Sequence, residues 1–268
     1  MKLGISSYTY TWSVGVPGSE PREPWDEMKL LQKAVELEVD CLQIADNLPL
    51  HSMKEKRLLK LKQKAAEARI ELEVGARGMT PEMLHRYIGI TSLLGSSMLR
   101  FVIDGPRFTP SVTEVIEIVK AVTPELKDQG IRLAIENHDR LLAREFLEIV
   151  EGSHSPNVGI CLDSVNSMGA GEGIETITTI LAPHTFNLHV KDFLAERHPH
   201  MMGFTIEGRP VGRGQLPLAW MLEQLGPQCQ SAILESWTPP EERIEKTMAK
   251  EADWAIESIN YLKNNHFH

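Results

Sequence analysis

The feature that most constrains the fold of this 268-residue chain is an alternation of short apolar runs with longer segments of helical periodicity. Short runs rich in β-branched residues predict strands, whereas apolar residues spaced three or four apart predict helices. Eight runs of the first kind follow one another: KLGISS (2–7), CLQIAD (41–46), IELEVGA (70–76), MLRFVID (98–104), IRLAIE (131–136), NVGICLD (157–163), TFNLHV (185–190) and SAILES (231–236).

The segments between these runs predict helices. They are expected at 25–38, at 54–69, from Thr80-Pro81, from Thr109-Pro110 to about Asp128, at 143–150, from about Gly173 and at 240–264. Eight strands alternating with helices predict a (β/α)8 TIM barrel, a single domain over residues 1–268. The rival, a doubly wound open sheet, usually has fewer strands, and the chain has no GxGxxG after its first strand and no P-loop.

The longest stretch without a predicted element lies between the seventh strand and its helix, at 195–215. It contains His198, His200, Glu207, Arg209 and Arg213. Long loops in compact domains are usually active-site lids or binding loops. Whether this loop closes over a site is left open.

The charge balance restricts the partners. The chain has 37 acidic and 28 basic residues, a net charge of -9, which argues against a nucleic-acid or anionic-membrane surface. Its three cysteines, Cys41, Cys161 and Cys229, are far apart in apolar runs, which favours buried thiols in a reducing compartment. With no signal sequence or membrane-spanning run, a cytoplasmic protein is expected. The oligomeric state is left open, a homo-oligomer included.

Acidic and imidazole side chains stand at the ends of four consecutive predicted strands. Strand five ends in Glu136, strand six in Asp163, strand seven carries His189, and strand eight ends near Glu235. The carboxyl ends of barrel strands meet at one rim, where active sites are built. We therefore expect these four side chains to converge.

Three buried carboxylates would repel one another without a compensating cation. A divalent cation (Mn²⁺, Mg²⁺, Co²⁺ or Zn²⁺) suits three carboxylates and one imidazole and leaves positions open for substrate oxygens. Taken singly, a strand-end glutamate is usually a solvated loop residue, and a lone strand histidine is usually part of the core. Four in succession favour a metal site formed by Glu136, Asp163, His189 and Glu235.

Lys191 and Asp192 follow His189 directly in the sequence LHVKDF. Lys191 is expected to act as a catalytic cation near a developing enolate or a substrate carboxylate. A Schiff-base role is the weaker reading, since the metal already supplies an electrophile. The structural alternative is a surface ion pair between Lys191 and Asp192.

Further residues at this end of the barrel are candidates for contacts with a substrate. Arg213, between two glycines and before a helix, could bind a substrate oxygen or carboxylate, or else lie at the rim. His138 could touch substrate, support Glu136 or belong to the core. Tyr10 and Asn47 follow strands one and two, as do Tyr8, Trp12 and Asp46, and the aromatic residues could form a pocket wall or only pack.

The motifs LAIENH, ICLD, LHVKD, GRGQLP and ILES resemble those of the sugar phosphate isomerase/epimerase-like TIM barrels, the xylose isomerase-like superfamily. The resemblance spans the chain. It implies one divalent metal bound by Glu136, Asp163, His189 and Glu235, with the two glutamates also serving as acid and base. The stretches GISSYTYTW and QIADNLPL look most like a branch that includes 3-oxo-isoapionate decarboxylase.

The chain departs from the epimerase pattern after strand six. Epimerases often carry Asp-x-x-His there, whereas this chain has Asp163 and then Asn166, which could hold a substrate hydroxyl but cannot relay a proton. The expected function is a metal-dependent isomerase or epimerase of a small keto sugar, acting through a metal-stabilised enediolate. The alternative is a metal-dependent lyase that decarboxylates a 3-oxo sugar acid or dehydrates a cyclic polyol.

Two other functions are weaker. A sugar-binding barrel without turnover is disfavoured because both catalytic glutamates are present. An endonuclease IV-like activity is disfavoured because it needs a three-metal cluster with additional histidines, and the chain is acidic throughout.

Overall fold

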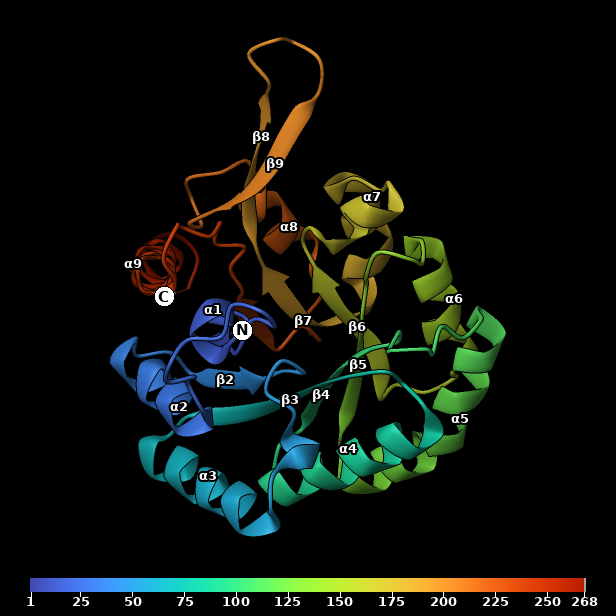
Figure 1. Cartoon of the computed structure of the whole chain (residues 1–268). Helices are drawn as coiled ribbons and strands as arrows, with labels where there is room; N and C mark the ends of the chain where they lie inside the picture. The colour runs from blue at the N-terminus through green and yellow to red at the C-terminus, as the bar shows by residue number, and fades with distance from the viewer. Residues whose placement is uncertain (268) are drawn as a thin grey trace.

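The computed structural model describes residues 1–267, and within them parallel strands close into a barrel in the order β1-β10-β7-β6-β5-β4-β3-β2 (Figure 1). The barrel strands are β1 (Lys2–Ser6), β2 (Cys41–Ile44), β3 (Glu71–Arg77), β4 (Met98–Val102), β5 (Arg132–Glu136), β6 (Val158–Asp163), β7 (Thr185–Val190) and β10 (Ser231–Leu234). The TIM-barrel prediction is confirmed. The last residue of the predicted domain, His268, lies outside the described residues.

Helices cover the outside of the barrel (Figure 1). They are α1 (Thr11–Val14), α2 (Glu27–Glu36), α3 (Glu55–Ala68), α4 (Pro81–Leu94), α5 (Val112–Gln129), α6 (Ala143–Gly152), α7 (Ile174–Leu181), α8 (Leu218–Gln224) and α9 (Ile244–Asn265), with 3-10 turns η1 (Leu50–Ser52), η2 (Asn166–Ala170) and η3 (Ala182–His184). None of the helices within residues 1–267 combines the length and the apolar character of a membrane span.

Local sequence explains where several helices begin and end. Thr80 caps α4 by accepting a hydrogen bond from the Met83 backbone N–H at 3.2 Å, with Pro81 as the first helical residue. Helix α5 begins after Ser111 rather than at the predicted Thr109-Pro110. There Ser111 and Glu114 form a capping box, which satisfies backbone N–H groups that the helix itself cannot.

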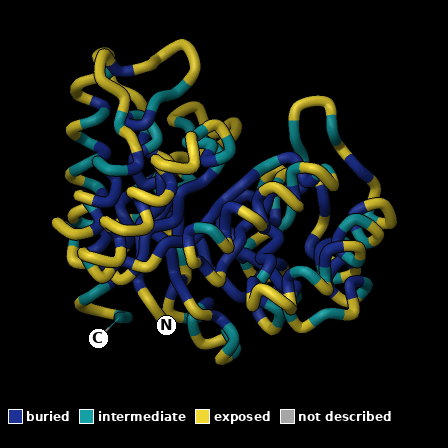
Figure 2. The backbone as a smooth tube through the Cα atoms, turned by 90° about the horizontal axis from the view of Figure 1, so that it is seen from below, coloured by how far each residue is buried: buried dark blue, intermediate teal, exposed yellow. Residues whose placement is uncertain are grey.

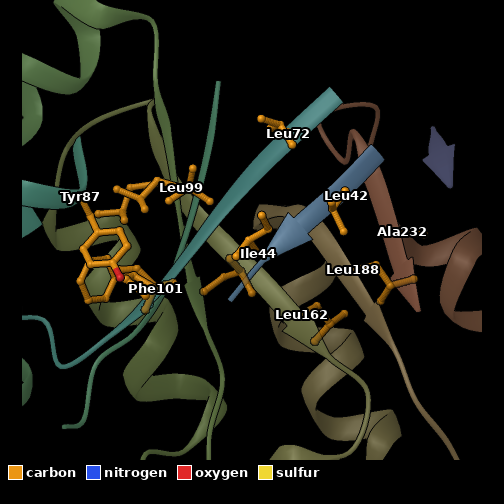
Figure 3. Close-up of a cluster of buried hydrophobic side chains, with 14 of the residues drawn as sticks. Leu42, Ile44, Leu72, Tyr87, Leu99, Phe101, Leu162, Leu188 and Ala232 are labelled. Atoms are coloured by element: carbon orange, nitrogen blue, oxygen red, sulfur yellow. The ribbon is translucent and has the colours of Figure 1, made fainter. Parts of the chain in front are cut away.

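The barrel wall is buried on both faces (Figure 2). Its outward side chains pack against the helices, as Leu42, Leu99 and Leu188 show in Figure 3. Phe101 of β4 meets Tyr87 of α4 edge to face, with ring centroids 6.0 Å apart. Because successive side chains of a strand point to opposite faces, Arg100 must point into the barrel.

The sequence suggested an irregular stretch at 195–215, but the structure has regular strands there. Strands β8 (Asp192–Arg197) and β9 (Phe204–Arg209) form an antiparallel hairpin that projects beyond the helices (Figure 1). Cross-strand pairs support it, since Arg197 stacks 4.4 Å from the Phe204 ring and Arg209 lies 3.0 Å from Glu196. The strands are stabilised by pairing with each other, which the polar composition of the segment did not predict.

Candidate metal centre and active site

The barrel opens at the carboxyl ends of its strands into a cavity of about 570 Å³. Acidic residues Glu136 and Glu235 line it together with Lys191 and Arg100. A second hollow of about 510 Å³ lies where the strands begin, around Lys2, but it does not include the strand-end carboxylates. The first cavity is therefore the candidate site.

The four strand-end residues converge as the sequence predicted. His189 Nδ1 lies 3.5 Å from Glu136 Oε2, 3.7 Å from Asp163 Oδ2 and 3.5 Å from Glu235 Oε1. All four side chains are almost wholly buried. The strand register places them together, since Asp163 is the neighbour of His189 across the β6–β7 pair.

The contacts around this cluster leave one buried atom open and two others held by a single cation. Among residues 1–267, His189 Nδ1 is buried without a hydrogen-bond partner, whereas Asp163 Oδ2 and Glu235 Oε2 have the ammonium of Lys191 as their close partner, at 2.7 and 2.9 Å. Buried polar atoms are nearly always satisfied, so an open imidazole nitrogen that faces three carboxylates points to a ligand. Asp163, His189 and Glu235 each offer a donor atom within 4.8 Å of the others, which fits a divalent cation with oxygen and nitrogen ligands.

Glu136 differs from the other two carboxylates. Its Oε1 accepts a hydrogen bond from Asn166 Nδ2 at 2.9 Å, and its Oε2 pairs with the guanidinium of Arg100. Both oxygens are therefore held by N–H donors of the protein. Glu136 can still add an oxygen to a metal at the cluster, because its Oε2 faces His189 Nδ1.

Lys191 lies inside the cluster rather than at the surface. Its Nζ is 2.7 Å from Asp163 Oδ2 and 2.9 Å from Glu235 Oε2, and the side chain is only 8% exposed. Burial opposes its charge, but Asp163 and Glu235 outweigh burial and raise the pKa of Lys191. A protonated amine is not a nucleophile, so the geometry disfavours the Schiff-base reading.

The suggested ion pair between Lys191 and Asp192 does not form. Asp192 Oδ2 instead accepts backbone N–H groups of Gly212 and Gly214 at 2.9 Å each, and its Oδ1 accepts that of Leu216 at 2.9 Å. The two glycines therefore let the backbone approach an internal carboxylate, not a substrate. Gly212 also adopts a left-handed φ of 89° that glycine tolerates.

Three residues predicted to bind substrate lie away from the cavity lining. Arg213 is 71% exposed and pairs with Glu257 at 2.5 Å. The ring of Tyr10 is buried against Trp25, with centroids 4.9 Å apart. Asn47 donates from Nδ2 to the Ser7 carbonyl at 3.0 Å and so braces the loop after β1.

The cavity walls come from other positions. Tyr8, Trp12 and Trp237 form an aromatic side, where Trp12 Nε1 donates to the Thr238 carbonyl at 2.8 Å. His138 and Asn166 also line the cavity, as the sequence suggested. The sequence had suggested Tyr8 and Trp12, which follow β1, as part of a pocket wall, but it had not suggested Trp237.

Sequence reasoning also missed Arg100, which organises one side of the site. Besides Glu136 it contacts Asp46, with Nη1 2.7 Å from Oδ1. Arg77 Nε lies 3.2 Å from Asp46 Oδ2, and Arg77 Nη2 lies 3.0 Å from His138 Nε2. The available signal was a charged residue in the middle of the apolar run MLRFVID, because a buried arginine needs charged partners.

The fold and cavity together define a TIM-barrel protein with a buried cluster of carboxylates and histidine at its carboxyl-terminal rim. The chain belongs to the xylose isomerase-like TIM barrel family, whose model matches residues 31–265. It is 29% identical over 264 residues to a 3-oxo-isoapionate decarboxylase of Pectobacterium atrosepticum, which covers 98% of this chain and 95% of the relative.

Solved structures of other proteins share this fold. A D-psicose 3-epimerase with D-fructose gives a TM-score of 0.73 at 16% identity and covers 100% of both chains. A xylose isomerase-like TIM barrel protein from Mycobacterium smegmatis in complex with magnesium gives a TM-score of 0.69 at 12% identity and covers 97% of each chain. At these identities the likeness shows the shared barrel.

Proposed function

We propose that the protein is a divalent-metal-dependent lyase that decarboxylates a small 3-oxo sugar acid. The metal ligands in this proposal are Asp163, His189 and Glu235, with Glu136 as the fourth. Support comes from the ligand atoms of the first three, which lie within 4.8 Å of one another, and from the similarity, along almost the whole chain, to a 3-oxo-isoapionate decarboxylase.

The observation that carries the proposal is the positive charge around the acidic cluster. Arg77, Arg100 and Lys191 line the cavity and face four carboxylates, those of Asp46, Glu136, Asp163 and Glu235. This leaves one uncompensated negative charge, which a divalent cation would reverse to one positive charge. Asp139 at the rim is 65% exposed and therefore screened by water. Such a site favours a substrate with a carboxylate over a neutral sugar.

Decarboxylation requires no proton to be removed from carbon, and it requires only one proton to be delivered after CO2 has left. The bond between the substrate's carboxylate carbon and its neighbouring carbon breaks, CO2 leaves, and the bond electrons move into the adjacent carbonyl group. A divalent cation, when bound, supplies positive charge for the oxygen of that carbonyl. Lys191 stabilises the same developing charge and can then deliver a proton from Nζ to the carbon that lost CO2.

The hydrogen bonds of Glu136 also favour this reaction over isomerisation. A base that removes a proton from carbon needs a lone pair directed at the substrate. Arg100 and Asn166 each occupy a lone pair of Glu136, and a bound metal would occupy another, which leaves little of the carboxylate to face a substrate. The lyase reaction needs no base at carbon. Asn166, an amide, serves to hold Glu136 and to bind a substrate hydroxyl.

Isomerisation or epimerisation of a keto sugar is the second candidate. Glu235 Oε2 has Lys191 Nζ, 2.9 Å away, as its one close partner among the described residues, so it could act as a base, and a D-psicose 3-epimerase has the same barrel. The two reactions differ in mass balance. An isomerase exchanges a C–H with solvent and keeps every carbon, whereas a decarboxylase loses one carbon as CO2.

Mass spectrometry separates these candidates. Keto sugars and 3-oxo sugar acids would be incubated with Mn²⁺-loaded enzyme in deuterated water, with Lys191→Met as the test variant and Arg213→Met as the matched control. We expect loss of CO2 from a 3-oxo acid, with kcat/KM lowered at least about 100-fold in Lys191→Met and unchanged in the control. Deuterium uptake without carbon loss would replace the lyase with an isomerase. Binding without any conversion would leave a sugar-binding barrel.

A further inference from the structure

A second polar layer lies in the barrel interior beneath the candidate metal ligands. It consists of Gln43, Glu73, Asn187 and Ser231, all of them buried. Glu73 Oε1 accepts from Ser231 Oγ at 2.6 Å, and Glu73 Oε2 accepts from Asn187 Nδ2 at 3.2 Å. Because β2 and β7 are not neighbours in the barrel, the contact between Gln43 and Asn187 crosses the interior.

Gln43 is the residue that joins this layer to the candidate metal ligands. Its Oε1 lies 2.8 Å from Nε2 of His189. Its amide nitrogen donates to Glu73 Oε2 at 2.9 Å and to Asn187 Oδ1 at 3.2 Å. Every polar atom of the Gln43 side chain therefore has a partner.

The partners determine which way the Gln43 amide faces. Glu73 Oε2 accepts from the amide groups of both Gln43 and Asn187, so the NH2 group of Gln43 faces Glu73 and its carbonyl faces His189. Nε2 of His189 must then carry the hydrogen. In a neutral imidazole this leaves the lone pair on Nδ1, the atom that faces the three carboxylates.

We propose that Gln43, oriented by Glu73, is a positioning residue that fixes the tautomer and ring orientation of His189 and thereby sets how tightly the cluster binds a divalent cation. The inference rests on the metal site of the proposed function but not on the reaction. Partners of this kind raise the affinity of histidine ligands for metals, because the ring is held ready for the ion.

Metal affinity is the direct test, with Mn²⁺ as the probe in isothermal titration calorimetry of the full chain. Gln43→Met keeps the side-chain length but cannot accept a hydrogen bond, so we expect the Kd for Mn²⁺ to rise about 10- to 100-fold. Gln43→Glu restores an acceptor for Nε2–H while placing a second carboxylate beside Glu73. It should lower stability in EDTA and yet bind Mn²⁺ more tightly than Gln43→Met.

Ser231→Ala serves as the control, since it removes a hydrogen bond to Glu73 but none to Gln43 or His189. We expect near wild-type affinity in this variant. The inference is overturned if Gln43→Met binds Mn²⁺ like the wild type, or loses no more affinity than Ser231→Ala. It is also overturned if the less stable variants always bind Mn²⁺ more weakly. In that case Gln43→Glu would not bind Mn²⁺ more tightly than Gln43→Met.

If Gln43→Met does not fold, Glu73→Gln carries the test, because a neutral amide partner lets Gln43 turn around. Reduced affinity relative to Ser231→Ala supports the inference, and equal affinity overturns it. A wild-type protein that binds no Mn²⁺ would overturn both this inference and the metal site. A protein that binds Mn²⁺ but releases no CO2 would overturn the proposed reaction alone.

Discussion

The two polar layers inside the barrel use similar side chains but satisfy them differently. In the lower layer, Gln43, Glu73 and Asn187 meet one another through complementary donors and acceptors. In the upper layer, within the described part of the chain, His189 Nδ1 has no hydrogen-bond partner, and Asp163 Oδ2 and Glu235 Oε2 share the ammonium of Lys191. Burial of acidic groups therefore does not by itself mark a metal site. The upper layer is distinguished by an open imidazole nitrogen beside carboxylates that share one lysine.

The layers also differ in how negative charge is balanced. Burial raises the pKa of Glu73, whose neighbours are mainly neutral donors such as Ser231 and Gln43. Burial likewise opposes ionisation of Glu235, but His189 and Lys191 outweigh it and lower the pKa of that carboxyl. The carboxylates of the upper layer are therefore kept ionised, which is the form in which a carboxylate binds a metal.

The largest expected effect comes from removing a cation of the upper layer. Arg100→Met leaves Glu136 and Asp46 buried without their shared guanidinium, so the free energy of unfolding in EDTA should fall by about 3–5 kcal/mol. Urea denaturation measures this. The double variant Arg100→Met/Glu136→Gln should recover part of the loss, and an unchanged midpoint in Arg100→Met would show that the upper layer does not depend on this cation.

A buried carboxylate that belongs to neither layer gives a pH-dependent contrast. Glu251 of α9 accepts hydrogen bonds from the backbone N–H groups of Trp12 and Ser13, and burial raises its pKa from 4.5 to about 7. The folded state then binds the proton more tightly than the unfolded state. Stability should fall as pH rises from about 4.5 to about 7, by on the order of 3 kcal/mol, and stay level above.

The control for this pH effect is Glu251→Gln, which cannot ionise. The difference in free energy of unfolding between wild type and variant, followed by urea denaturation across that pH range, isolates the contribution of Glu251. A constant difference would mean that the carboxyl titrates normally in the fold.

Metal addition should stabilise the upper layer alone. At free Mn²⁺ of about 100 times its Kd, the free energy of unfolding should rise by about 2.7 kcal/mol, because the ion binds only the folded cluster. Thermal unfolding with Mn²⁺ and with EDTA measures the rise. Glu235→Gln should lose most of it, and a variant that keeps the full rise would remove Glu235 from the ligand set.

The smallest effect is expected in the lower layer. Ser231→Ala removes one hydrogen bond to Glu73 and one from Asn187, which should cost about 1–2 kcal/mol in urea denaturation. Its stabilisation by Mn²⁺ should match that of the wild type. If Mn²⁺ no longer stabilised this variant, the two layers would act as one unit and the contrast between them would not hold.

Much of the architecture follows from local sequence. The apolar runs contain the barrel strands, and caps such as Thr80 and Ser111 begin helices by the chemistry of single side chains. The meeting of Glu136, Asp163 and His189 was also predictable, because each stands at the carboxyl end of its strand and those ends share one rim.

The remaining features depended on contacts between distant segments. Arg213 was placed in the site by its flanking glycines and the helix that follows, and Tyr10 by its position after the first strand. Partners elsewhere in the chain, Glu257 and Trp25, hold them away from the cavity lining. The hairpin at 192–209 depends on cross-strand pairing, and the hydrophobic periodicity of the segment did not predict it.

Neighbours along the chain set the order of the barrel strands and the ionisable groups that reach the rim, so both could be predicted from the sequence. Only the tertiary structure decided which charge each group meets: Lys191 lies between Asp163 and Glu235, Arg100 holds Glu136, and Gln43 faces His189. The physical reason is barrel closure. Strands that are far apart in sequence point side chains into one interior, and their register sets the pairs that form there.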